Sequence, residues 1–191
     1  MNFTSLKDIP TIETQNFLLR GISLEDAESL YSFMSDRETM KYITPFPVTT
    51  LEEMENKVND SIESFLRQKE IPWVIIHKAD NELIGMFRFH KLHLWHKKTE
   101  MGAVIRDDFQ RKGVMTEILK PLLEFGFLTL QLNRIVGDLF ASNKGSQRLM
   151  GKFGFHKDGQ LRQTDFDGEE YHDTIVYSLL KSEYDAQNKG R

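Results

Sequence analysis

The chain has 191 residues, with 25 Lys and Arg against 29 Asp and Glu, and it contains no cysteine. This length is typical of one domain, which we expect to span residues 1–191, and it suffices to bury a hydrophobic core. The net charge of −4 disfavours a nucleic-acid partner, because nonspecific binding of nucleic acid requires a concentrated basic surface. The missing cysteine excludes disulfides, thiolate metal ligands and cysteine nucleophiles, and it suits a reducing compartment.

The sequence predicts neither a signal peptide nor a membrane anchor. Its first residues, MNFTSLKDIP, lack an apolar run. No stretch of the chain approaches the ~20 apolar residues that cross a bilayer. We therefore expect a cytoplasmic protein with no membrane partner. The folded core is expected over about residues 12–184, with flexible polar ends at Met1–Thr11 and Asp185–Arg191.

The hydrophobic pattern predicts strands and helices in a mixed order. A strand at Phe17–Gly21 precedes two helices, which begin near Ser23 and at Thr50 with acidic residues in their first turns. Between these helices, Asp36–Thr49 contains two prolines and is expected not to form regular helix.

A hairpin and a third strand are predicted next, at Trp73–His77, Leu83–His90 and Thr99–Arg106. The helical pattern of Lys112–Leu130 contains Pro121. This proline must either kink the helix or start a second one.

The last third of the chain predicts a strand at Arg134–Phe140 and a short helix opened by Asn143. A final strand pair, Phe155–Thr164 and Thr174–Leu180, surrounds the loop Asp165–Asp173. Because strands and helices do not strictly alternate, the order favours a mixed α/β sheet with packed helices over a doubly wound Rossmann fold.

The loop that follows the predicted strand Thr99–Arg106 has the composition of an anion site. Residues 104–117 read VIRDDFQRKGVMTE, and a helix beginning near Gly113 presents free N–H groups and a partial positive charge. Glycine allows a ligand to approach the backbone closely, and Arg111, Lys112 and the Thr116 hydroxyl add donors. The loop is neither a P-loop nor a GxGxxG loop. An ordinary strand–helix connection with solvated basic residues is the alternative.

Two motifs together resemble the GNAT superfamily of N-acetyltransferases. Gln110 and Gly113 match its acetyl-CoA pattern Q/R-x-x-G-x-G/A, and Asn143-x-x-Ser146 with a following Gly-Phe pair matches its later motif. Four segments are similar to the RimJ/RimL type of ribosomal-protein N-terminal acetyltransferase, namely IETQNFLLRGISLEDAESLYSFMSD, GVMTEIL, NRIVGDLFASNKGSQRLMGKFGF and HDTIVYSLL.

This resemblance covers nearly the whole chain and implies a GNAT-like acyl-CoA N-acyltransferase fold. Its features would be a central, mostly antiparallel sheet and flanking helices. It also implies acetyl-CoA as co-substrate and no metal. In the family, the turn and helix start bind the pyrophosphate, and the preceding strand edge pairs with the pantetheine arm. The expected cofactor-binding residues are therefore Val104, Ile105, Arg106, Arg111, Lys112, Gly113, Val114, Met115, Thr116 and Asn143.

Two of these residues, Met115 and Asn143, need a further remark. Met115 stands where the family pattern prefers Gly or Ala, so its side chain must point away from the phosphates. Asn143 has the alternative role of a plain helix N-cap. We expect both roles to hold, with the backbone capping the helix while the side chain reaches the pantetheine arm.

The implied reaction requires a base for the attacking amine and oriented donors for the oxyanion. Many relatives carry a tyrosine acid where this chain has Met150, so we assign Ser146, one turn earlier, as the candidate acid. A solvated helix residue is its alternative. Glu100 is the candidate base, because strand alternation turns it away from Met101 and toward the cleft, where burial makes a carboxylate more basic. A structural salt bridge is the alternative for Glu100.

The histidines are weaker candidates. His90, His93 and His96 have a spacing that metal ligands can show, but no acidic or cysteine partner lies near them in the sequence. We interpret them as solvated residues of a strand end and loop. His172, in the last loop, is a candidate for contact with the substrate.

The acceptor is expected opposite the cofactor, between Asp36–Thr49 and Asp165–Asp173, with Tyr42 and Phe46 as an apolar wall. The second segment is rich in acids, which favours a cationic acceptor, although an ordinary polar hairpin turn is the alternative.

The resemblance thus implies an enzyme that transfers acetyl directly from acetyl-CoA to a primary amine in a ternary complex. A protein N-terminal α-amine is the first candidate acceptor, and a polyamine or aminoglycoside-type amine is the second. From another class, a non-catalytic acyl-CoA-binding module is the alternative, which the departures at Met115 and Met150 support. A homodimer is compatible with the resemblance, although the sequence shows no apolar stripe that we assign to an interface.

Overall fold

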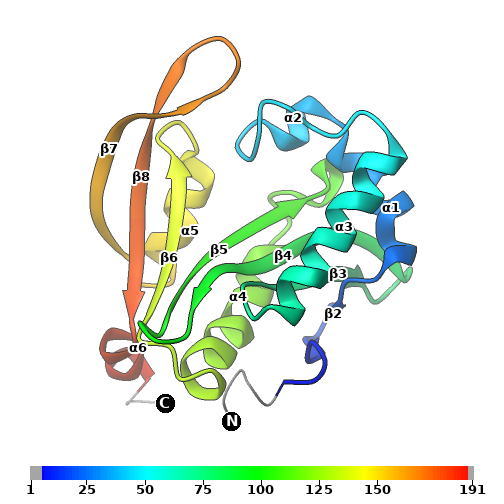
Figure 1. The fold of residues 1–191 in the computed structure, drawn as a ribbon. Helices are drawn as coiled ribbons and strands as arrows, with labels where there is room; N and C mark the ends of the chain where they lie inside the picture. Colours follow the sequence, from blue (N-terminus) through cyan, green and yellow to red (C-terminus); the bar gives the residue numbers. More distant parts are fainter. Residues whose placement is uncertain (1–5, 189–191) are drawn as a thin grey trace.

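The computed structural model describes residues 6–188, which form one eight-stranded sheet with helices on both faces (Figure 1). The strands, in chain order, are β1 (Ile12–Glu13), β2 (Phe17–Gly21), β3 (Ile71–His77), β4 (Glu82–His93), β5 (Lys98–Ile105), β6 (Arg134–Phe140), β7 (His156–Phe166) and β8 (Tyr171–Leu180). The α-helices are α1 (Ala27–Met34), α2 (Arg37–Met40), α3 (Leu51–Leu66), α4 (Val114–Glu124), α5 (Lys144–Lys152) and α6 (Lys181–Asn188).

The strand order is β1-β2-β3-β4-β5-β6-β8-β7, and β5–β6 is the one parallel pair in the part of the chain that the structure describes. The expected mostly antiparallel sheet is therefore confirmed. A parallel connection needs a crossover, and α4 supplies it between β5 and β6.

The central strands are buried on both faces, so alternate side chains reach two separate cores. Trp73 and Phe87 belong to the core that contains the apolar face of α4. Their neighbours Val74 and Met86 belong to the second core, beside α1 and α3. The sheet therefore separates an α4 side from an α1–α3 side, and this division positions the site.

The β5–β6 pair is short, and the two strands then diverge (Figure 1). Its register includes Lys98↔Arg134, Thr99↔Ile135 and Glu100↔Val136, and it goes no further. Beyond Glu100, the rest of β5 remains paired with β4 on its other side. We call the diverging, facing edges of β5 and β6 the split, with Glu100 at its vertex.

The segment Asp36–Thr49 contains one helical turn that we did not expect. Helix α2 occupies Arg37–Met40, and the carboxylate of Asp36 accepts a hydrogen bond from Thr39 N at 2.7 Å as its N-cap. Both prolines of the segment follow this turn, so neither interrupts it. The expectation of no regular helix is wrong for these four residues.

The final hairpin is also more regular than we expected. Strands β7 and β8 extend to Phe166 and Tyr171, which pair with each other, so the loop shrinks from Asp165–Asp173 to residues 167–170. The bulge between Leu161 and Asp165 absorbs a change of register that the period of the sequence did not reveal.

Pro121 lies inside α4 rather than at the start of a second helix. The helix ends at Glu124, and the chain continues as a π-helical segment at Phe125–Thr129, where Leu130 N donates to Phe125 O at 3.0 Å. Helix α4 is therefore one continuous helix from Val114 to Glu124.

The expected flexible ends lie partly within the described residues. Pro10 O accepts a hydrogen bond from Trp73 Nε1 at 2.7 Å, and Asp185–Asn188 complete α6. The remaining positions of those ends, residues 1–5 and 189–191, lie outside the described residues. Within residues 6–188, no helix combines the length and the apolar character needed to cross a bilayer.

Candidate active site

The N-terminus of α4 offers an open anion site beside the split. Gly113 is its N-cap, with φ of +86°, and no side chain caps the helix there. A Cβ added to Gly113 would meet no atom within 4 Å, so the backbone is accessible to a ligand. Arg111 also has a positive φ, of 59°, and both Arg111 and Lys112 are exposed. Free helical N–H groups and two nearby cations fit the pyrophosphate of coenzyme A.

The next three residues of α4 hold this terminus on the sheet. Val114 is buried, and the half-buried Met115 packs against the core on the α4 side. The Met115 side chain thus leaves the anion site clear, as the family pattern requires of a bulky residue. Thr116 is half-buried in the same turn.

Sequence reasoning missed how the preceding turn is held. Gln110 Nε2 donates to Ile105 O at 2.9 Å, which ties the turn to the end of β5. Arg106 bonds to Asp108 and Glu82, with its Nη2 2.7 Å from Glu82 Oε2. The bond to Asp108, with that to Glu82, raises the pKa of Arg106 although burial opposes it. The Arg106 side chain is therefore a brace of the turn rather than a free ligand for phosphate.

Glu117 anchors the first turn of α4 to the opposite edge of the sheet. Its carboxylate accepts from Asn16 N at 2.7 Å and from Asn16 Nδ2 at 2.8 Å. Burial acts to raise the pKa of Glu117, but hydrogen bonds from Thr14 and Asn16 outweigh it and lower that pKa. This negative charge is thus already paired with donors close to the anion site.

Helix α5 borders the other side of the split. Asn143 is its N-cap, and the side-chain Oδ1 accepts from Ser146 N at 3.0 Å. This corrects our expectation that the backbone alone would cap, although Nδ2 is left to donate. Met150 lies near Gly137 of β6, where an added Cβ would be 3.3 Å from its sulfur. Ser146, four residues earlier, shares that helix face and so lies toward the split.

Glu100 lies at the vertex of the split with its side chain 24% exposed. Its Oε2 is 2.7 Å from Lys91 Nζ, so the salt bridge that was its alternative role is present. Asp138 of β6 is a close neighbour of Glu100. The pKa of Asp138 is raised, mainly by burial and also by the negative charge of Glu100. Two carboxyl groups therefore face the same region, one paired with lysine and one partly desolvated.

His90 corrects our expectation of a solvated histidine. It pairs with Glu100 in the β4–β5 ladder and is half-buried. Burial, followed by the charge of Arg88, lowers the pKa of His90 to about 4, so its ring is neutral at pH 7. By contrast, His93 and His96 are exposed, with ring centroids 4.2 Å apart.

A cavity of about 350 Å³ lies on the α1–α3 side of the sheet, opposite α4. Its lining includes three residues of β5, Gly102, Ala103 and Val104, so the cavity reaches the strand that borders the split. Other lining residues come from the α1–α3 layer and from β3–β4, namely Met34, Met40, Ile43, Met54, Lys57, Asp60, Ser61, Glu70, Met86 and Arg88.

The segment Asp36–Thr49 contributes to this cavity as we expected, but through other side chains. Tyr42 and Phe46 do not line it. The Tyr42 ring lies 6.1 Å from that of Phe140 at the end of β6, and Phe46 is exposed. The aromatic pair Tyr42 and Phe140 therefore lies at the end of β6 that is farthest from Glu100, and not inside the cavity. We call this end the mouth of the split.

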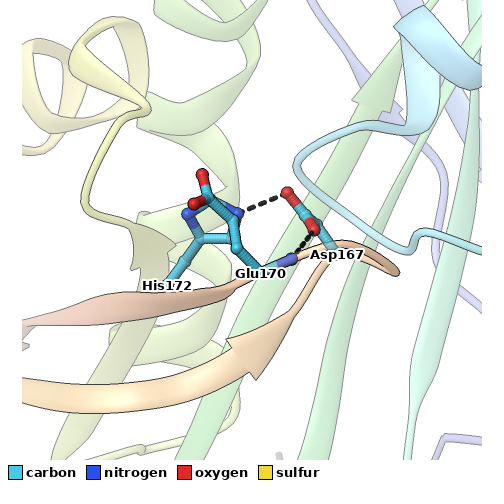
Figure 2. A group of neighbouring side chains, drawn as sticks. All are labelled: Asp167, Glu170 and His172. Carbon is cyan, nitrogen blue, oxygen red and sulfur yellow. Dashed lines mark hydrogen bonds and ion pairs between the residues drawn. The ribbon is translucent and has the colours of Figure 1, made fainter.

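The β7–β8 hairpin reaches the same mouth, with a hydrogen-bonded turn at its tip (Figure 2). Asp167 accepts from Glu169 N at 2.8 Å and Glu170 N at 2.9 Å, and it also bonds His172 Nε2. These bonds lower the pKa of Asp167 to about 2 and raise that of His172. Figure 2 shows Asp167, Glu170 and His172 together, but both oxygens of Asp167 are engaged inside the turn.

The hairpin contacts both neighbours across the mouth. The His172 ring lies 5.6 Å from Phe140, and a Cβ added to Gly168 would be 3.8 Å from Pro45. Residues 36–49 and the acidic hairpin thus approach each other, and their role as walls of the acceptor site stays a prediction.

The chain is similar over nearly its whole length to known acetyltransferases. Residues 16–156 match the Acetyltransferase (GNAT) domain. The chain is 32% identical over 172 residues to the uncharacterized N-acetyltransferase YoaA of Bacillus subtilis strain 168, covering 90% of this chain and 97% of YoaA.

Two solved structures share the fold at lower identity. One is RimL, a ribosomal L7/L12 alpha-N-protein acetyltransferase in complex with coenzyme A, with a TM-score of 0.83, 20% identity and coverage of 90% and 98%. The other is spermidine N-acetyltransferase from Vibrio cholerae in complex with CoA and spermine, with a TM-score of 0.80, 24% identity and coverage of 88% and 98%.

These findings agree with the open α4 terminus, the split between β5 and β6, and the expected resemblance to the RimJ/RimL type. The chain belongs to the GNAT family of N-acetyltransferases, and it is an acyltransferase that uses acetyl-CoA.

Proposed function

We propose that this protein acetylates the α-amine of a protein N-terminus, with acetyl-CoA as the donor. One observation carries the proposal: the exposed N-terminus of α4 follows β5 in the chain, and Gly102–Val104 of the same strand line a cavity on the opposite side of the sheet. A donor and an acceptor could thus reach the same vertex, at Glu100, from different faces.

The residues near the split divide the work in this proposal. The N–H groups of Gly113–Thr116, with Arg111 and Lys112, would hold the pyrophosphate, and the free edge of β5 at Val104 and Ile105 would hold the pantetheine arm. Bound acetyl-CoA supplies an acyl group activated as a thioester. Asn143 Nδ2 would donate a hydrogen bond to that arm.

Two side chains would handle protons. Glu100 would accept the amine proton at Oε1, because Oε2 is held by Lys91 at 2.7 Å. The Ser146 hydroxyl, on the α5 face toward the split, would donate its Oγ proton to the departing thiolate of coenzyme A. Both roles were expected from the sequence and remain part of the proposal.

The chemistry of an α-amine suits this site. Its ordinary pKa is about 7.7–8.0, so roughly a tenth is neutral at pH 7, whereas an alkyl amine such as lysine, near 10.4, is almost entirely charged. The cavity lining also balances Lys57 and Arg88 against Asp60 and Glu70, which gives no excess negative field for a polycation.

A polyamine is the second candidate acceptor. Glu100 and Asp165 both act to raise the pKa of Asp138, so three carboxyl groups surround the acceptor side of β6. Such a group would attract a polycation. The Vibrio cholerae structure of similar fold is a spermidine acetyltransferase.

The test is acetyl-CoA turnover, followed as release of the free thiol, with matched amines. Peptides with a free N-terminus are compared with the same peptides blocked by N-terminal acetylation, and with spermidine. We expect free peptides to be acetylated, with the product on the α-amine by mass spectrometry. Preference for spermidine over every peptide would favour the polyamine function. Binding of acetyl-CoA, seen as a raised Tm, without turnover of any amine would favour a non-catalytic module.

We propose that the reaction takes place in the cytoplasm, as expected from the sequence. The absence of cysteine suits a reducing compartment.

A further inference from the structure

Glu70 is a buried carboxylate with one unsatisfied oxygen in the wall of the cavity. The residue immediately precedes β3 and is 8% exposed. Its Oε1 is buried and forms no hydrogen bond within the described residues. The guanidinium of Arg88 stands 3.7 Å from this oxygen, which is too far for a hydrogen bond. A buried acceptor in this condition is uncommon and calls for a donor from outside the chain.

The position of Arg88 connects Glu70 to the reaction centre. Arg88 pairs with Gly102 across the β4–β5 ladder, and its Nε lies 3.7 Å from where a Gly102 Cβ would be. The same side chain reaches Glu70 through Nη1. The guanidinium thus lies in the cavity lining between Gly102 of β5 and the unsatisfied oxygen. An acceptor with its amine near Glu100 would extend past this guanidinium.

We propose that Glu70 and Arg88 form a subsite for an uncharged carboxamide, the side chain of Gln or Asn at the first residue of the acceptor. This inference rests on the proposed function and deepens it. A carboxamide has an N–H donor and a carbonyl acceptor on neighbouring atoms. The donor would satisfy Glu70 Oε1, and the carbonyl would accept from Arg88 Nη1.

Other side chains meet this pair less well. An ammonium group would satisfy Glu70 but would be repelled by Arg88. A carboxylate would suit Arg88 but would stand against Glu70. An apolar side chain of the same size would leave the buried Oε1 without a donor. The charged pair therefore selects a group that both donates and accepts.

The experiment uses three peptides that differ only in the first residue, Gln, Met or Glu, which are similar in length. Because the apolar analogue leaves buried polar groups unpaired, we expect kcat/KM for Gln to exceed that for Met by about tenfold or more. The Glu peptide should be the poorest. In Glu70→Ala the ratio of Gln to Met should approach one.

The variant Glu70→Gln tests the same subsite with a side chain of the original shape. Its amide can donate to a carboxylate, so the preference for Gln over Glu should narrow at least several-fold. Glu63→Gln is the matched control, because Glu63 is an exposed carboxylate of α3 that pairs with Arg67. It should keep the wild-type ratios. The affinity for coenzyme A and the Tm report whether each variant is folded.

The outcomes separate this inference from the proposed function. If peptides are acetylated but Gln and Met differ less than twofold, or if Glu70→Ala keeps the wild-type ratio, the subsite is wrong and the proposed function stands. Should Glu70→Ala not fold, an unchanged ratio of Gln to Glu in Glu70→Gln overturns the subsite.

If only spermidine is acetylated, the proposed function fails, and the same peptides are then measured as inhibitors of spermidine turnover. Stronger inhibition by the Gln peptide than by the Met peptide in the wild type, with the difference lost in Glu70→Ala, supports the subsite. Equal inhibition by the Gln and Met peptides overturns it.

Discussion

Gly113 combines two properties that a phosphate site needs at the level of a single residue. Its φ of +86° suits glycine, and the open space around it exposes the first N–H groups of α4. A side chain there would stand where we expect the pyrophosphate. Charge and bulk can be separated at this position, because both Asn and Asp tolerate a left-handed backbone better than most residues.

Gly113→Asp should weaken coenzyme A binding by about tenfold more than Gly113→Asn, because only Asp adds a negative charge at the helix N-terminus. Both variants should lose a similar amount of stability, on the order of 1 kcal/mol, from the backbone conformation. Calorimetric titration with coenzyme A gives the affinities. Equal affinities in the two variants would contradict an anion site at Gly113.

Glu100→Gln should lower kcat and change the dependence of rate on pH, because the amide cannot accept the amine proton. The affinity for coenzyme A should stay within about twofold of wild type, since Glu100 is placed on the acceptor's side of the reaction. Glu13→Gln is the control, because Glu13 also pairs with a lysine, Lys78 at 2.6 Å, but lies in β1 at the edge of the sheet. Its pH profile should match that of the wild type. An unchanged pH profile would remove Glu100 as the base.

His90 should make the fold less stable in mild acid. Its folded-state pKa of about 4 lies below the ordinary 6.5, so the unfolded chain binds the proton more readily. The stability that the neutral His90 ring contributes to the fold is fully present above pH 6.5 and is lost as the pH falls toward 4. After allowance for solvent screening, the loss should be about 2 kcal/mol.

Urea unfolding of wild type and His90→Gln at pH 7 and pH 4.5 measures this difference. The variant should lose less free energy of unfolding between the two pH values. His93→Gln, which changes an exposed histidine of the same strand, should behave as wild type. Identical losses in wild type and His90→Gln would contradict the burial of that ring.

At the scale of elements, the termini of two helices define the cofactor side of the split. Helix α4 leaves its N-terminus without a side-chain cap, whereas α5 is capped by Asn143. This contrast has a physical reason: free N–H groups bind an anion, and a side-chain cap consumes one of them. The uncapped helix follows Arg111 and Lys112, where an anion is expected, and the capped helix follows no such pair.

Asn143 variants separate its two roles at the start of α5. Asn143→Asp keeps the oxygen that accepts from Ser146 N but removes the Nδ2 donor. It should retain stability and lose affinity for coenzyme A by several-fold. Asn143→Ala should lose the same affinity and about 1 kcal/mol of stability as well. Thermal unfolding and coenzyme A titration distinguish them, and full affinity in Asn143→Asp would leave Asn143 as a cap alone.

At the scale of the whole molecule, a single parallel strand pair creates the site. The pair β5–β6 has only a short ladder, and the α4 crossover lies on one face while the cavity lies on the other. Strands that diverge leave backbone groups unpaired, which is unfavourable unless water or a ligand satisfies them. If the pantetheine arm binds at the split, as proposed, the sheet should gain hydrogen bonds there on binding.

Hydrogen exchange should detect this gain. Amides of Met101–Ile105 that face β6 should exchange faster in the free protein than those of Lys98–Glu100, which lie within ladders on both sides. Coenzyme A should slow the first group and leave the second nearly unchanged. Exchange followed by mass spectrometry measures both groups, and protection confined to the start of α4 would contradict binding along the β5 edge.

Much of this organisation was readable from local pattern. The capping residue Thr50, the apolar spacing of α3 and the β3–β4 hairpin depend on neighbours in the chain, and all were predicted. The motif around Gly113 predicted the start of α4, and with it a site for the cofactor, because a helix terminus is also a local feature. The extents of β7 and β8 were missed, since a bulge shifts the register without changing composition.

The sequence by itself determined the family and the order of the main elements, and it predicted a site for coenzyme A, because each of these depends on residues adjacent in the chain. Only the tertiary structure decided that Glu100 is paired with Lys91, that His90 is neutral and that Glu70 lacks a donor. Burial and pairing arise from strands and helices far apart in sequence, and no local pattern encodes which face they share. The acceptor side depends on such contacts throughout, which is why its chemistry follows from the fold and not from any local pattern in the sequence.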